Sequence, residues 1–141
     1  MRFIAMVLFV ILLPSSIVFA CKCRQPPAPK VALEASSAVF SGKVTNIETD
    51  NQGIVRITFE ISRTWKGTKE SSVKVSTATT SAACGYKFKK GESYLVYCYR
   101  SDSRGKKPGI LHTNICTRTR SLKMAVDDLK ELGEGKKPKP A

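Results

Sequence analysis

The sequence predicts a mainly β protein whose strands form a small closed or nearly closed barrel, with a short helix before it and a helix after it. Three observations support this fold class. Residues 55–62 alternate between apolar and polar side chains, which is the period of a half-buried strand. Turn signals recur about every eight to twelve positions, a spacing typical of small all-β domains. The chain shows no internal repeat, and its length suits one modest core.

Residues 1–20 have the three parts of a cleavable signal peptide. Arg2 supplies the positive charge, and Phe3–Leu13 is an apolar run too short for a membrane span, which needs about 20 residues. Small side chains stand one and three residues before Cys21, where we expect cleavage. We therefore predict a secreted chain that begins at Cys21, with an uncleaved N-terminal anchor as the alternative.

The elements of the barrel follow in order. Three closely spaced prolines exclude a helix over 24–29, and a short helix fits 30–37. Gly42 is expected to form a bulge in the first strand. Small residues over 79–85 form a linker, and polar residues over 101–109 form a hairpin loop. The expected strands cover residues 38–47, 55–62, 72–77, 93–99 and 110–115.

The end of the chain predicts a helix and then a tail. Apolar residues recur at helical spacing over 122–132, which indicates an amphipathic helix that Gly133 ends. Residues 133–141 are basic and rich in glycine and proline, so we expect a disordered tail. The predicted domain therefore covers 21–132.

The sequence is strongly basic, with 24 Lys and Arg against 11 Asp and Glu. Only Arg2 would be lost with the signal peptide, so the mature chain keeps 23 basic residues against 11 acidic ones, a formal charge of +12. Such a charge favours anionic glycans or lipid surfaces as partners. We expect no nucleic acid partner, because an exported protein rarely meets one. A basic surface that only aids solubility is the alternative.

All five cysteines lie after residue 20. In an oxidising compartment disulfides are expected, and an odd count leaves at least one thiol free or paired with another chain. Cys21-Lys22-Cys23 is a C-x-C pair without a second close pair, so a zinc ion held by this protein's own cysteines is not expected. No cofactor is predicted.

Candidate catalytic residues are scarce. His112, the only histidine, lies in a strand pattern, and Cys98 lies inside an apolar strand where an inert thiol is expected. Asp127 and Asp128 are expected to be solvated charges on the last helix. Glycine-rich phosphate loops and metal-protease helix motifs do not occur in the sequence. The sequence therefore predicts a protein that is not an enzyme.

Cleavage before Cys21 would create an unusual group. A free α-amine and the carbonyl of the same residue can form a five-membered chelate around a metal ion, and an α-amine with pKa about 7.7–8.0 is partly neutral at neutral pH. A protease zinc keeps one open position that holds water. A rigid terminus could displace that water. Alternatively, the C-x-C pair merely pins a loose terminus to the barrel.

Further motifs accompany the terminal Cys21–Cys23. Prolines follow it closely, Trp65–Gly67 is an aromatic-Lys-Gly turn, and Ser81–Gly85 ends in Cys-Gly. Tyr94–Val96 precedes a hairpin and a strand that reaches Cys116. Together these motifs, which span most of the predicted mature chain, resemble the N-terminal netrin-like domain of the tissue inhibitors of metalloproteinases (TIMPs).

The resemblance implies an OB-fold-like, five-stranded barrel with disulfides Cys21–Cys84 and Cys23–Cys116, which leave Cys98 unpaired. It also implies inhibition of a zinc metalloproteinase. Cys21 would chelate the catalytic zinc of the target through its amine and carbonyl, and Lys22 would enter the adjacent pocket. The remaining residues expected to contact the target are Cys23, Ser81, Ala82 and Ala83.

The chain departs from the family at Lys22, where inhibitors usually carry a small Thr or Ser. Burying an unpaired ammonium group in an apolar pocket costs several kcal/mol, so the expected target offers an acidic group there. No cysteine supports the family's third disulfide of this domain.

Two other functions stay open. The high charge, Lys22 and the basic tail fit a non-inhibitory netrin-like binding module for anionic glycans, lipid surfaces or partner proteins. Val18–Cys21 partly resembles a bacterial lipobox, so acylation of Cys21 could instead anchor the chain to the cell envelope and consume its amine.

Overall fold

The structure, a computed structural model, describes residues 21–101 and 109–140. The predicted signal peptide, most of the predicted loop at 101–109, and Ala141 lie outside the described residues. In the part of the chain that is described, no helix is long and apolar enough to span a membrane.

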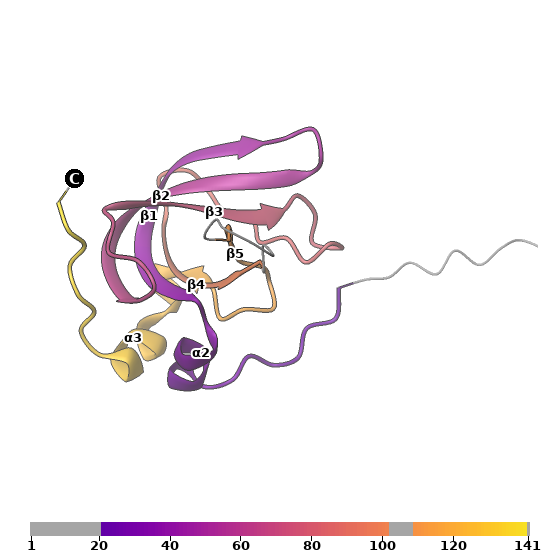
Figure 1. The fold of residues 1–141 in the computed structure, drawn as a ribbon. Helices are drawn as coiled ribbons and strands as arrows, with labels where there is room; N and C mark the ends of the chain where they lie inside the picture. Colours follow the sequence, from indigo (N-terminus) through magenta and orange to yellow (C-terminus); the bar gives the residue numbers. More distant parts are fainter. Residues whose placement is uncertain (1–20, 102–108, 141) are drawn as a thin grey trace, which may run out of the picture.

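Six strands and two α-helices make up the described chain (Figure 1). The helices are α2 (Pro29–Ala35) and α3 (Val126–Leu132), and a 3₁₀ turn over Leu122–Met124 precedes α3. The strands are β1 (Ala38–Thr49), β2 (Ile54–Lys66), β3 (Ser72–Ala78), β4 (Ser93–Arg100), β5 (Leu111–His112) and β6 (Arg120–Ser121).

The sheet closes on itself. β1 pairs with β2 and β2 with β3, both antiparallel, and β3 pairs with β5 in parallel. β5 then pairs with β4, and β4 pairs back with β1, which completes a ring of five strands. The short β6 is not part of this ring and pairs antiparallel with the start of β4. The predicted OB-fold-like five-stranded barrel is therefore confirmed.

Gly42 lies in the part of β1 that pairs with both β2 and β4. The register between β1 and β2 shifts between Ser41 and Gly42, so the predicted bulge is confirmed. A Cβ at Gly42 would lie 2.7 Å from the carbonyl oxygen of Glu60, so only glycine fits this close approach.

Two apolar clusters hold the fold together. One fills the barrel, where Phe40 and Phe59 meet edge to face with ring centroids 5.4 Å apart. The other lies between the barrel wall and the helices, and includes Val39 and Tyr97. Because β1 and β4 have the barrel interior on one face and the helices on the other, consecutive residues of both strands are buried.

The structure corrects the prediction for the last helix. The expected helix over 122–132 divides into the 3₁₀ turn and α3, and Asp128 is buried, with 1% of its surface exposed. It accepts hydrogen bonds from Arg118 at 2.7 and 2.8 Å and from the Tyr97 hydroxyl at 3.3 Å. A carboxylate with such partners can be buried, whereas adjacent Asp127 is exposed as expected.

The last predicted strand is shorter than expected. Residues 110–115 were expected to pair, whereas β5 covers only Leu111–His112. The chain leaves the sheet after Thr113, because Asn114 starts a tight turn by accepting the backbone N–H groups of Cys116 and Thr117.

The tail also differs from its prediction. The segment 133–140 lies along β2 rather than free in solution. Thr64 and Lys136 exchange two backbone hydrogen bonds of 2.7 and 2.8 Å, and the Trp65 indole donates to the carbonyl of Gly133 at 3.0 Å. The reason is an unpaired edge: β3 stops pairing with β2 at Glu60, so the rest of β2 can accept another chain segment.

Candidate functional site

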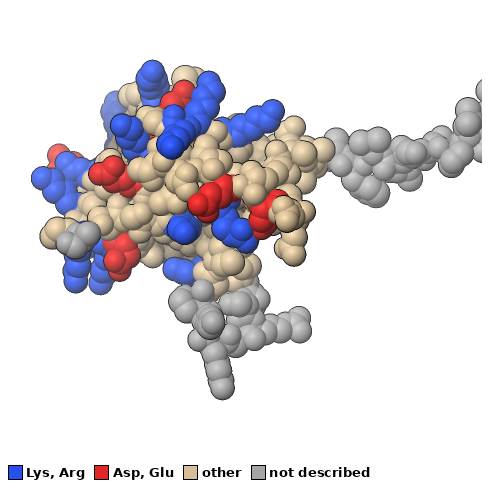
Figure 2. Space-filling model, turned by 90° about the horizontal axis from the view of Figure 1, so that it is seen from above, with Lys and Arg blue, Asp and Glu red and all other residues tan. Residues whose placement is uncertain are grey.

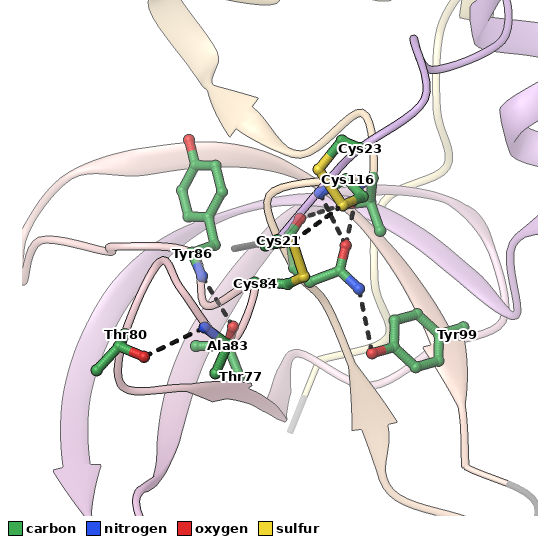
Figure 3. The surroundings of a disulfide bond; sticks show 11 residues. Cys21, Cys23, Thr77, Thr80, Ala83, Cys84, Tyr86, Tyr99 and Cys116 are labelled. Carbon is green, nitrogen blue, oxygen red and sulfur yellow. Dashed lines mark hydrogen bonds between the residues drawn. A yellow bond between two sulfur atoms is a disulfide. The ribbon is translucent and has the colours of Figure 1, made fainter. Parts of the chain in front are cut away.

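Two disulfides fix the segment that starts at Cys21 to the barrel (Figure 3). Cys21 is bonded to Cys84, with Cα atoms 5.3 Å apart, and Cys23 to Cys116, with Cα atoms 4.9 Å apart. Both pairings implied by the family resemblance are confirmed, and Cys98 is the free cysteine. Disulfides are typical of proteins in an oxidising compartment.

Cys84 ends a tight turn after β3. Backbone hydrogen bonds within the turn stabilise it: the N–H of Ala83 donates to the carbonyl of Thr80 at 3.2 Å, and the N–H of Gly85 donates to the same carbonyl at 2.8 Å. Cys84 adopts a positive φ of 63°, which L residues rarely adopt. A Cβ at Gly85 would lie 2.0 Å from the carbonyl oxygen of Ala78. Position 85 thus has room only for glycine, next to the disulfide-bonded Cys84.

Cys116 is held by a second turn. The side-chain carbonyl of Asn114 accepts the N–H of Cys116 at 2.9 Å, and its amide group donates to the Tyr99 hydroxyl at 3.3 Å. The N–H of Ile115 donates to the carbonyl of Cys84 at 3.0 Å, which joins the two turns directly. Sγ of Cys21 lies 3.6 Å from Sγ of Cys116, so the two disulfides are in contact.

Three segments therefore meet beyond the end of β3. We call them the N-terminal edge, formed by Cys21–Cys23, Ser81–Cys84 and Asn114–Cys116. Cys21 is half-buried beside the turns, whereas Lys22 and Cys23 are exposed. Ser81, Ala82 and Ala83 are exposed too, in the turn to which Cys21 is tethered. The structure thus brings all the predicted site residues onto one edge, and their contact with a target stays a prediction.

Arg118 is a positioning residue that the sequence analysis missed. Its guanidinium donates to the carbonyl of Pro27 at 2.8 Å and forms a salt bridge with Asp128. The proline-rich segment after Cys23 is thereby tied to α3. Burial raises the pKa of Asp128, but hydrogen bonds from Arg118 and the charges of Arg120 and Arg118 outweigh it, so the pKa is lowered overall.

The signals for these supporting residues differ. Asn114 stands two residues before Cys116, a spacing at which an asparagine side chain commonly bonds the backbone, so its role could have been found. Arg118 lies in a Thr-Arg-Thr-Arg run that gives no periodicity and no partner. Only the fold brings it between Pro27 and Asp128.

The sulfur atoms of Cys21, Cys84 and Cys116 lie within 4.8 Å of one another. Three thiolates at that spacing could bind a metal ion. All three atoms belong to disulfides here, so their thiolates are not available as ligands.

The remaining thiol and the histidine are not among the residues that form the edge. Cys98 is 1% exposed in the barrel core, and burial raises its pKa, so the thiol stays protonated at neutral pH. His112 stacks on Tyr99 with ring centroids 5.8 Å apart, and burial lowers its pKa. These environments suit packing rather than a thiolate–imidazolium pair.

A comparison of the sequence with protein-family models finds no match, and the curated proteins contain no match either.

Proposed function

We propose that this chain is a secreted, TIMP-like inhibitor of zinc metalloendopeptidases. In this proposal, removal of residues 1–20 frees the amine of Cys21, and that amine and the Cys21 carbonyl chelate the catalytic zinc of the target. The observation that carries the proposal is the clamp on the terminal C-x-C: each cysteine is bonded to a different turn of one barrel edge.

The clamp lowers the cost of binding. A free N-terminus must lose backbone freedom of about 1–2 kcal/mol per residue when it binds. Cys21 and Cys23 are already held by disulfides, and Arg118 holds the carbonyl of Pro27 a few residues later. More of the interaction energy therefore remains for affinity.

The chemistry matches what a protease zinc accepts. Such a zinc has three protein ligands and a water in the open position, and the water is the nucleophile for hydrolysis. An amine and a carbonyl from one residue would take that position and remove the nucleophile. The exposed turn at Ser81–Ala83 would contact the target protease beside its zinc, because Cys84 tethers this turn to Cys21.

Lys22 would set the choice of target. Its side chain is exposed and follows the chelating residue directly, so it would enter the pocket beside the zinc. An ammonium group in a closed pocket needs a carboxylate or several carbonyl oxygens as partners. The proposed targets are therefore endopeptidases whose specificity pocket contains an acidic group.

The test compares the mature chain, beginning at Cys21, with a variant that carries one extra alanine before Cys21. Inhibition constants are measured with fluorogenic peptides on zinc endopeptidases with acidic and with apolar pockets. We expect the mature chain to inhibit the first group. The extended variant should inhibit at least about 100-fold less, or about 2.7 kcal/mol, because an amide nitrogen does not replace an amine as a zinc ligand.

Intact mass is the control for this test. Both proteins must show two disulfides and no acyl chain, and they should unfold at the same temperature. Equal inhibition by the two forms would refute chelation by Cys21, and acylation of the natural protein would support the lipid-anchored alternative.

A further inference from the structure

A cleft of about 970 Å³ lies at the other end of the barrel from the N-terminal edge. Its residues come from the turn between β2 and β3, from the ends of β4 and β5, and from the C-terminal segment. We call it the basic cleft, because six cationic side chains line it: Lys66, Lys69, Arg100, Lys136, Lys137 and Lys139.

The charge of the cleft is almost unopposed. Glu70 is the one acidic residue that lines it, and all six cationic residues are exposed. The salt bridges in the described part of the chain use other carboxylates, those of Asp50, Glu92 and Asp128. Lys66 is partly engaged, since its ammonium group donates to two carbonyls of α2 at 2.7 and 3.2 Å. Figure 2 shows basic side chains, with a few acidic ones among them, at the left-hand end of the molecule, which is also the end of the C-terminal segment in Figure 1.

The C-terminal segment builds one wall of the basic cleft. Beyond its pairing with Thr64, its Lys139 N–H donates to the carbonyl of Lys69 at 2.8 Å, which ties the segment to the β2–β3 turn. Gly135 makes this path possible, because a Cβ there would lie 2.9 Å from the Trp65 ring. The lysines of the tail and those of the β2–β3 turn are therefore held on facing segments rather than scattered in solution.

The basic cleft and the N-terminal edge are separated by the length of a strand. Val73, near the start of β3, lines the cleft, and the turn that ends in Cys84 follows the other end of β3. At about 3.3 Å per residue, the seven residues of β3 span on the order of 20 Å, and Leu111, the cleft residue nearest in sequence to Asn114, lies on the order of 10 Å from the edge. A ligand bound in the cleft would therefore use none of the residues of the N-terminal edge.

We propose that the basic cleft binds a sulfated polysaccharide. A linear chain with closely spaced sulfate groups can contact cations on both walls at once, and each contact releases counterions, as occurs for other linear polyanions. This inference concerns residues that the proposed inhibition does not use, so either proposal can fail alone.

The shape of the cleft favours a polysaccharide over a lipid surface. A planar bilayer presses on a convex face and gains from apolar side chains that insert into it. The most exposed apolar side chains of the described chain, Met124, Val126, Ile110 and Val31, do not line the cleft. A narrow polymer can enter the cleft, whereas a bilayer meets only its rim.

The test measures binding of a size-defined heparin oligosaccharide by the full mature chain. The variant reverses three tail charges, Lys136→Glu, Lys137→Glu and Lys139→Glu. The matched control reverses three exposed lysines outside the cleft, Lys43→Glu, Lys87→Glu and Lys90→Glu, so both proteins lose the same net charge. We expect the dissociation constant to rise at least about tenfold for the cleft variant and less than about threefold for the control.

A second variant tests whether the position of the tail matters when the net charge is unchanged. Gly135→Val leaves the charge unchanged but should push the tail away from Trp65. We expect weaker heparin binding together with a shifted fluorescence of Trp65, the only tryptophan in the chain. For the native protein, affinity should fall steeply as salt rises.

Three outcomes would overturn the proposal. They are equal losses in the cleft variant and its control, heparin binding that is unchanged in both cleft variants, and binding to phosphatidylserine vesicles without binding to the oligosaccharide. The inhibition assay on the same variants tells the proposals apart, since the cleft variants should inhibit as the native chain does.

Discussion

Lys22 is the residue at which a single side chain would decide the target. It is exposed between two cysteines whose backbone is fixed, so its direction is set by the clamp rather than by packing of its own. A flexible, strongly hydrated ammonium group in this place favours a pocket that offers a carboxylate.

Replacing Lys22 by threonine tests this role. We expect Lys22→Thr to improve inhibition of endopeptidases with apolar pockets by about tenfold, and to weaken inhibition of those with acidic pockets by a similar factor. The reason is that the Lys22 ammonium group must lose its hydration in an apolar pocket without gaining a partner, whereas in an acidic pocket it pairs with a carboxylate. The measurement is the ratio of inhibition constants on the two classes.

Lys74→Thr is the matched control for this ratio, because Lys74 is exposed on β3, outside the edge. Threonine is well suited to a strand, so the barrel should be unaffected. A ratio that changes equally in both variants would show that general charge, not entry of Lys22 into a pocket, selects the target.

For single residues, the sequence predicts those roles that depend on neighbours along the chain. The terminal C-x-C, the Cys-Gly pair and the free Cys98 follow from spacing, the odd cysteine count and the family resemblance. Arg118 and Asp128 do not, because a buried ion pair is defined by partners that the fold brings together from Pro27, α3 and β4. The pattern of one helix cannot show them.

Helix α3 is the element that depends most on one buried group. Asp128 holds it to the barrel through Arg118, whose side chain is only 15% exposed, and through Tyr97. Arg120 lies 3.8 Å from the same carboxylate. Removing the negative charge would leave the guanidinium of Arg118 without its partner in a largely buried place.

We expect Asp128→Asn to lower the free energy of unfolding at pH 7 by about 3 kcal/mol. Since the pKa of Asp128 is lowered in the folded state, its contribution is complete above about pH 5 and is lost as the pH falls through the folded-state pKa. The difference between native and variant protein should therefore shrink below about pH 4. Urea unfolding at pH 7 and at pH 3 measures it.

Asp127→Asn is the control for this comparison, because Asp127 is the exposed neighbour on the same helix. It should change the unfolding free energy by less than about 0.5 kcal/mol. A difference between native protein and Asp128→Asn that stays constant from pH 7 to pH 3 would contradict the assignment to the carboxylate charge.

Strands were predicted best where β-branched and aromatic residues give a strong local signal. The alternation over 55–62 lies inside β2, and the expected strands at 72–77 and 93–99 match β3 and β4 to within one residue at each end. β6 and the placement of the tail could not be predicted, because both are set by unpaired edges of strands distant in sequence. Their own composition gives little strand signal.

The whole molecule depends on the two disulfides that join its first residues to the barrel. The Cys23–Cys116 bond links residues 93 positions apart, and a loop of that length contributes about 4 kcal/mol in the chain-entropy model. Replacing Cys23 and Cys116 together by serine should lower the unfolding free energy by that order. It should weaken inhibition more than about tenfold, because Cys21 keeps one anchor instead of two.

Chemical unfolding and the inhibition assay are measured at a temperature where the variant is folded, as far-ultraviolet circular dichroism shows. Cys98→Ala is the control, since this thiol lies in the core away from the edge. Inhibition that survives loss of the Cys23–Cys116 bond unchanged would contradict the importance of the second anchor.

The length of β3 has a consequence for where such a protein would act. A ligand held in the basic cleft would use none of the residues of the N-terminal edge, so the two proposed partners would bind different surfaces. A molecule retained on an immobile polymer would meet nearby proteases at an effective concentration far above its average one. Geometry alone would thus confine its action to the immediate neighbourhood of the surface that retains it.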